Sequence, residues 1–164
     1  MTRTYDIWRA SFTRRWHRHA YLCDTHDPVG AHQGRVMLLV LALEPTASRN
    51  LLIAAATHDI GEAAVGDVPN PVKNRNPDLK AALDRIEAAA VQAMGLPIPR
   101  LNADETKMLR LCDKLDAVMR ANHHHDRRLM SQPGWQADIR ECREIAKQLG
   151  LAFEVEKLME GLSL

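Results

Sequence analysis

A His-Asp doublet stands at the end of the most apolar stretch of one predicted helix. His58 and Asp59 follow the residues LLIAAAT, so both side chains are expected to be at least partly buried. Ionisable side chains buried without a partner cost several kcal/mol. A bound cation would remove that cost, because imidazole and carboxylate groups are both ligands of first-row metal ions. The doublet therefore predicts a metal site.

Three further residues are candidates to complete such a site. His32 stands near the start of the apolar segment 31–44, and Asp113 lies within MLRLCDKLDAVM. Glu62 follows His58 by four residues and Asp59 by three, so on a continuous helix it shares their face. Taken singly, a histidine near a helix start or an aspartate in an amphipathic helix is more often an ordinary hydrogen-bonded or solvated residue. The joint pattern is far more specific than any one of its members.

This pattern resembles the HD-domain metal-dependent phosphohydrolases, which carry a His, a His-Asp doublet and a distant Asp. Within that superfamily the chain is most similar to the 5′-deoxynucleotidase group, which includes phage-type dATP and dNTP triphosphohydrolases. The resemblance covers roughly residues 5–120, and its most specific part is the doublet followed by GDVPNPVK. The matching residues are Arg15-Trp16, His32, His58-Asp59, Glu62, Gly66-Asp67-Val68-Pro69, Pro71, Lys73 and Asp113.

The resemblance implies a role for each of these residues. The metal ligands would be His32, His58, Asp59 and Asp113. Glu62 and Asp67 would be catalytic. Glu62 would act as an acid/base or water-orienting group, or as a ligand of a second cation. Asp67 would position the attacking water. The substrate would be bound by Arg15 at the phosphate, Trp16 and Pro71 at the nucleoside, and Lys73 near the phosphate. One departure is visible: Ala31-His32-Gln33 stands where the family commonly has Glu-His-Ser.

The reaction implied is hydrolysis of the 5′-phosphate or phosphates of a deoxyribonucleotide at a divalent cation. Histidine ligands favour Mn, Co, Zn or Fe over Mg. A monophosphatase would release phosphate from a dNMP, and a triphosphohydrolase would release triphosphate from a dNTP. Additional cations near the phosphates would favour the second reaction, and the candidates are Lys114, Lys107 and Arg110. The alternative function is a non-catalytic HD-like module for nucleotide sensing or assembly, which predicts the loss of a ligand or of Glu62.

Other histidines have weaker claims to a metal. His26-Asp27 is a second doublet, but Pro28 follows it directly, so it is interpreted as part of the surface or of a pocket rim. The run His123-His124-His125-Asp126 comes at the end of a predicted helix. Consecutive helical residues point in different directions, so this run is interpreted as a solvated helix end, with a subunit contact or adventitious metal binding as the alternative.

The candidate site residues are predicted to lie on helices and on the short segments between them. Aromatic residues make up 4% of the chain, and no run alternates as a half-buried strand does. Asn76-Pro77 and the pair Asn102 and Glu105 mark helix starts, and Gly95 marks a helix end. We expect an all-α HD-domain bundle of about six to seven helices, in a single domain over 1–164. The expected helices are 4–16, 31–44 (nearly all buried), 49–65, 77–94, 103–122, 135–149 and 152–160, with a loop over 17–29 and a non-helical turn at the prolines of GDVPNPVK.

Composition limits the partners and the compartment. The chain has 164 residues, 46% of them hydrophobic, and a net charge of +1, which argues against binding a nucleic-acid polymer. No run of 18 apolar residues exists and the N-terminus lacks the apolar core of a signal peptide, so no membrane partner is expected. Three well-separated cysteines suit a reducing cytoplasm, the host cytoplasm if a phage encodes the chain. The resemblance suggests a homo-oligomer.

Overall fold

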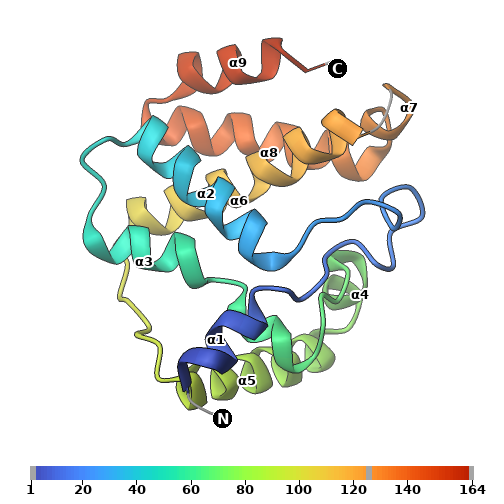
Figure 1. The fold of residues 1–164 in the computed structure, drawn as a ribbon. Coiled ribbons are helices and arrows are strands. Elements are labelled where there is room, and N and C mark those ends of the chain that lie inside the picture. Colours follow the sequence, from blue (N-terminus) through green and yellow to red (C-terminus); the bar gives the residue numbers. More distant parts are fainter. Residues whose placement is uncertain (1–2, 125–126, 163–164) are drawn as a thin grey trace. The chain divides into compact units, whose positions relative to one another are not determined.

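The regular elements of this protein are helical. The computed structural model describes residues 3–124 and 127–162, and within these ranges it contains no β-strand, only an isolated antiparallel bridge between Arg14 and Pro28 (Figure 1). The predicted all-α fold class is confirmed. The chain forms two compact units, Met1–Gly34 with Ala56–Pro99 and Arg35–Ala55 with Arg100–Leu164. Among the described residues, no helix is both long enough and apolar enough to cross a membrane.

The first unit is built on the long helix α5. The elements that lie wholly within it are α1 (Arg3–Ala10), the 3-10 helix η1 (Ile60–Ala64), α4 (Asn70–Arg75) and α5 (Pro77–Met94). Helices α1, η1 and α4 each contact α5. A side chain on Gly61 would come within 2.7 Å of the Glu87 carbonyl oxygen, so glycine is required where η1 crosses α5. Helix α5 begins at Asn76-Pro77 and ends at Gly95 in the left-handed conformation, as the sequence predicts.

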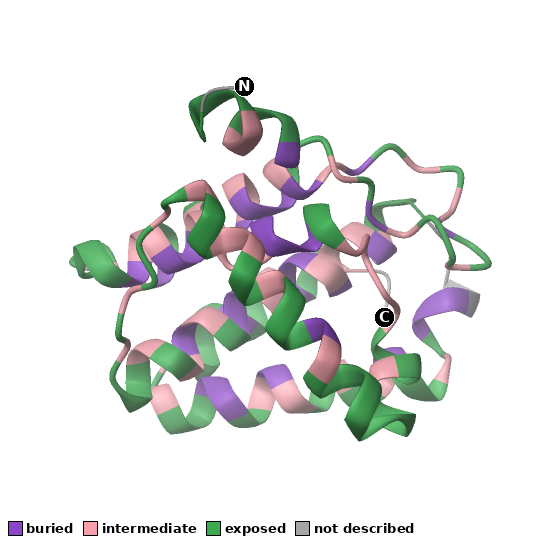
Figure 2. Cartoon of the chain, turned by 90° about the horizontal axis from the view of Figure 1, so that it is seen from below, coloured by how far each residue is buried: buried purple, intermediate pink, exposed green. Residues whose placement is uncertain are grey.

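The second unit centres on α6 (Ala103–His124) and α8 (Pro133–Leu149), with α7 (Arg127–Met130) and α9 (Ala152–Glu160). Helix α6 packs along α8, and α8 packs against α9. Helices α2 (Val29–Leu43) and α3 (Arg49–Thr57) contribute residues to both units. The long helices carry buried residues on one face and exposed residues on another (Figure 2). The buried residues of α6, α8 and α9 include Leu111, Leu115, Val118, Ile139, Cys142 and Val155.

Hydrogen bonds in the second unit confirm the predicted helix start at Asn102 and Glu105, and two further residues mark helix ends there. The Asn102 amide donates to Glu105 Oε2 at 2.8 Å, and the Glu105 amide donates to Asn102 Oδ1 at 2.9 Å, which is a capping box at the start of α6. Ser48 Oγ accepts from the Leu51 amide at 3.1 Å before α3. Gly150, in the left-handed conformation, separates α8 from α9. These signals act over three or four residues, which explains why they can be found from the sequence.

Two segments of the first unit differ from the prediction. Helix α1 ends at Ala10 and does not reach residue 16, because Ser11 and Thr13 donate from their hydroxyls to the Trp8 and Ala10 carbonyls and the chain leaves the helix. The expectation of no helix at the two prolines is also wrong. Pro69 and Pro71 stand at the beginning of α4, where a missing amide proton costs no helical hydrogen bond.

Helices outside the first unit also depart from expectation. Helix α2 is not nearly all buried, since Leu38 and Leu41 are exposed. Helix α8 begins at Pro133, two residues before the expected start at residue 135. The predicted helix 49–65 is interrupted at residues 58–59, and this interruption matters for function.

Candidate metal centre

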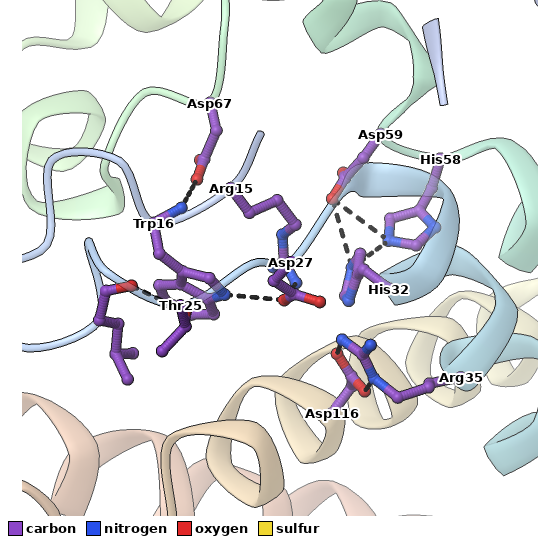
Figure 3. A network of polar contacts seen from close by, with 11 residues as sticks. Arg15, Trp16, Thr25, Asp27, His32, Arg35, His58, Asp59, Asp67 and Asp116 are labelled. Atoms are coloured by element: carbon purple, nitrogen blue, oxygen red, sulfur yellow. Dashed lines mark hydrogen bonds and ion pairs between the residues drawn. The ribbon is translucent and has the colours of Figure 1, made fainter. Parts of the chain in front are cut away.

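The predicted His-Asp doublet meets the predicted first histidine. His32 Nε2 lies 3.1 Å from His58 Nε2 and 3.3 Å from Asp59 Oδ2, and His58 Nε2 lies 3.6 Å from the same carboxylate oxygen (Figure 3). Each of the three residues offers a ligand atom within 4.8 Å of the others. His32 is fully buried, whereas His58 and Asp59 are partly open. Two imidazole nitrogens and a carboxylate oxygen directed at one point are a donor set that suits a first-row transition ion.

The interruption between α3 and η1 makes this convergence possible. Helix α3 ends at Thr57 and η1 begins at Ile60, so the doublet occupies a two-residue turn and not a continuous helix. Asp59 has φ −103° and ψ 3°, in the sparsely populated bridge region. Within a regular helix the two side chains would point about 100° apart. The turn removes that constraint, and both side chains reach His32.

Gln33, next to His32, holds this turn in place. In the amide orientation that satisfies its neighbours, Gln33 accepts from the Asp59 and Ile60 amides at 3.2 and 3.0 Å and donates to the Ala56 carbonyl at 3.1 Å. The side chain is buried. In the sequence, Gln33 is distinguished only as a departure from the family pattern. A polar residue beside a ligand in an apolar helix is itself a signal, because a buried amide must find partners.

Glu62 lies close to the doublet in a largely closed environment. It is 6% exposed, its backbone amide donates to the Asp59 carbonyl at 3.0 Å, and Lys73 Nζ lies 3.8 Å from its Oε1. Oε2 is buried without a hydrogen-bond partner among the described residues. Burial, followed by the charges of Asp59 and Asp67, raises the pKa of Glu62 to about 8, although Lys73 and Arg15 act in the opposite direction. A carboxyl group with such a pKa can exchange a proton near neutral pH.

Arg15 and Trp16 are held by two aspartates. Arg15 is buried and forms an ion pair with Asp27 Oδ2 at 3.6 Å, while Trp16 Nε1 donates to the same oxygen at 2.8 Å (Figure 3). The Trp16 amide donates to Asp67 Oδ2 at 2.9 Å, and the Arg15 guanidinium lies 4.9 Å from the centre of the Trp16 ring system. Trp16 has φ +64°, a left-handed conformation that is unfavourable for a bulky residue. Such strain persists only where the surroundings enforce it, and it is common at ligand sites.

The position of Asp27 differs from the interpretation of the His26-Asp27 doublet and adds Asp27 to the residues of the site. His26 is exposed, but Asp27 is fully buried and is not part of a surface or pocket rim. One feature of the sequence distinguishes Asp27 from the other acid of the 17–29 loop: it directly precedes a proline, and a residue in that position favours an extended backbone. Asp67, predicted to position water, has its described contact with the Trp16 backbone. Its catalytic role stays a prediction.

The remaining predicted residues are placed as follows. Pro71 is exposed on α4, and Lys73 on the same helix is the cation beside Glu62. Asp113 is half-buried on α6 in the second unit, so its place in the ligand set stays a prediction.

The three cations predicted for a triphosphate tail already have acidic partners. Lys114 pairs with Asp138 and Glu141, Arg110 with Glu141, and Lys107 with Asp104. The structure therefore gives no support to these cations as phosphate ligands, and the assignment of Lys114 stays a prediction. His123 and His124 are exposed at the end of α6, and His125 and Asp126 lie outside the described residues.

Comparisons with known proteins identify the family to which the chain belongs. The model of the family described as "5'-deoxynucleotidase YfbR-like" matches residues 42–127, more than half of the chain, a range that includes the doublet, Glu62 and Asp113. A dATP triphosphohydrolase of Cyanophage S-2L is 28% identical over 127 residues, which cover 73% of this chain and 69% of the phage protein. No solved structure matches the chain. The resemblance seen in the sequence is thus confirmed, and the chain belongs to the YfbR-like 5′-deoxynucleotidase family.

Proposed function

We propose that the protein is a metal-dependent hydrolase that removes the 5′-phosphate or phosphates of a deoxyribonucleotide. The observation that carries this proposal is the convergence of His32, His58 and Asp59 on one point, beside the buried acid Glu62. Membership of the YfbR-like family and the name of the phage relative support a deoxynucleotide as the substrate. All the residues whose loss would indicate a non-catalytic module are present.

The metal would be held by His32, His58 and Asp59, with Asp113 proposed as the fourth ligand on the sequence pattern alone. The observed donor set supports this, and it favours Mn, Co, Zn or Fe over Mg. When bound, the divalent cation would stabilise negative charge on the phosphoryl oxygens and activate water for attack.

The protein side chains would then manage the proton and the phosphate. Glu62, in its ionised form, would accept the proton from the attacking water, and its position beside Lys73 supports this role. Asp67 would help to orient that water. Arg15 and Lys73 would bind the anionic phosphate, since a guanidinium offers several donors to phosphate oxygens at once.

The nucleoside would lie against Trp16, with Pro71 as a second contact. Asp27 would be a positioning residue, because one carboxylate oxygen restrains both the Arg15 guanidinium and the Trp16 indole. Lys114 would have to leave two acidic partners to reach a substrate, so its role has the weakest support.

The proposed function also bears on the partners and the compartment of the protein. We propose a deoxynucleotide as the small-molecule partner, a homo-oligomer as the assembly and the cytoplasm as the compartment. The three cysteines are free thiols, which favours a reducing environment.

The test is the identification of products. Protein treated with a chelator and then supplied with Mn or Co is incubated with each dNMP and each dNTP. Phosphate released from a dNMP indicates a 5′-nucleotidase, and intact triphosphate released from a dNTP indicates a triphosphohydrolase. Glu62→Gln should keep the metal and lose at least about 100-fold in kcat. If neither phosphate nor triphosphate is released from any of these substrates with either metal, the proposal is contradicted.

A further inference from the structure

Glu87 on α5 is an acid that the proposed mechanism does not use. The residue is half-buried, and its Oε1 atom is buried without a hydrogen-bond partner in the part of the chain that the structure describes. Buried polar atoms in native proteins nearly always have a partner, so an exception calls for an explanation. A role in a functional site is one such explanation, and the surroundings of Glu87 favour it.

The contact between η1 and α5 brings Glu87 next to the proposed catalytic acid. A Cβ atom on Gly61 would lie 2.7 Å from the Glu87 carbonyl oxygen and 2.9 Å from Glu87 Cβ. Gly61 is directly followed by Glu62. The side chain of Glu87 therefore starts from α5 at the place where η1 carries Glu62.

Lys73 is the cation that acts on both acids. It lies on α4, which packs against α5 (Figure 1), and its Nζ lies 3.8 Å from Glu62 Oε1. Burial raises the pKa of both acids, and the charge of Lys73 opposes that rise in both. For Glu87, Lys73 has the largest effect of any charged residue. The two carboxyl groups and the ammonium group thus form one electrostatic cluster.

The contact with Glu62 is too long to fix the ammonium group of Lys73. A hydrogen bond between a nitrogen and an oxygen atom normally spans about 2.7–3.2 Å, so at 3.8 Å the pair attracts without a directed bond. An ammonium group has three protons to donate, and it stands at the end of a flexible four-carbon chain. A second carboxylate, on another helix, can supply the missing restraint.

We propose that Glu87 is a positioning residue, which holds the ammonium group of Lys73 in place for the phosphate of the substrate. The inference rests on the proposed function, in which Lys73 binds that phosphate. Glu87 itself does not touch the substrate. Its contribution is to order Lys73 before the nucleotide arrives, so that binding does not have to bear the cost of ordering a flexible side chain.

The first experiment measures the kinetics of the metal-loaded protein with the nucleotide that the product assay identifies. Glu87→Gln keeps the shape of the side chain and removes its charge. It should raise KM about five- to tenfold and change kcat less than about twofold, because a restraint on binding is lost while the metal ligands and Glu62 are untouched. The matched control is Asp78→Asn, which removes an exposed carboxylate from the first turn of the same helix and should change neither constant. An unchanged KM, or a loss confined to kcat, would overturn the proposal.

The second experiment asks whether Glu87 acts through Lys73. Lys73→Met keeps most of the length of the side chain and removes the ammonium group. Adding Glu87→Gln to this variant should leave its KM unchanged, since no ammonium group remains to be held. If Glu87→Gln raises KM by the same factor with and without Lys73, Glu87 acts on another group and the proposal is wrong.

A third measurement needs no substrate and separates this inference from the proposed function. Urea unfolding midpoints are compared for the wild type, the two single variants and the double variant, in the presence of a chelator. The shift caused by Glu87→Gln should differ by at least about 0.2 M between the wild type and Lys73→Met, because residues that interact are not additive. If no nucleotide is hydrolysed, the proposed function fails, but this comparison still shows whether Glu87 holds Lys73. Equal shifts in the two backgrounds would overturn the inference.

Discussion

Replacing Glu62 with glutamine should stabilise the protein when no metal is bound. Glu62 is 6% exposed, and burial beside Asp59 and Asp67 raises its pKa from 4.5 to about 8. In the unfolded chain the carboxyl group ionises near its ordinary pKa, whereas in the folded chain it keeps its proton until higher pH. The stability associated with this group is therefore complete below pH 4.5 and is lost as the pH rises toward 8.

The size of the effect follows from the pKa difference. Each pH unit between the two pKa values removes about 1.4 kcal/mol from the free energy of unfolding, which amounts to about 3 kcal/mol by pH 7. Glutamine has nearly the same shape and carries no charge at any pH. Glu62→Gln should thus match the wild type near pH 4.5 and exceed its stability by about 3 kcal/mol at pH 7.

Urea unfolding at several pH values, in the presence of a chelator, measures this difference. The matched control is Glu154→Gln, which removes an exposed carboxylate from α9 and should shift stability by less than about 0.5 kcal/mol. A constant difference in stability between wild type and Glu62→Gln across the pH range would contradict this prediction, because it would show that the folded environment does not oppose ionisation of Glu62.

Three further changes test other parts of the site and its support. Gln33→Ala should leave the fold intact but weaken metal binding by about 10- to 100-fold, measured by titration calorimetry, because the doublet turn loses its three side-chain hydrogen bonds; unchanged affinity would contradict this. Asp27→Asn should raise KM for the nucleotide more than it lowers kcat, whereas Asp24→Asn at an exposed position should change neither; a loss confined to kcat would count against the positioning role. Asp116→Ala should lower the free energy of unfolding by about 2 kcal/mol, because it removes two hydrogen bonds that the Arg35 guanidinium donates to the Asp116 carboxylate, at 2.6 and 3.0 Å. In a double-mutant cycle with Arg35→Ala, strictly additive effects would contradict that pairing.

Local signals account for the parts of the fold that the sequence predicts well. Asn76-Pro77, Gly95 and Gly150 determine backbone conformation through their own chemistry, and α9 has the predicted bounds. The prolines at the starts of α4 and α8 lie inside helices that were not predicted to include them, because the first turn of a helix accepts the residue that its interior excludes.

Functional details were harder to predict because they depend on distant partners. Nothing in LLIAAATHDIGEAA marks a break at residues 58–59, since the turn is held by Gln33, which is 26 residues from Asp59 in the sequence. The burial of Asp27 depends in the same way on Arg15 and Trp16. Residue types and spacing indicated which side chains to bring together, but not the turn or the loop that does so.

Metal binding by the chelator-treated protein shows whether the His32, His58 and Asp59 cluster is a metal site. Titration calorimetry with Mn or Co should detect binding to the wild type, loss of that binding in His58→Ala, and full retention in His26→Ala, which alters the exposed histidine of the other His-Asp doublet. If His58→Ala binds the metal as tightly as the wild type, the His32, His58 and Asp59 cluster is not the metal site, and the proposed mechanism fails with it.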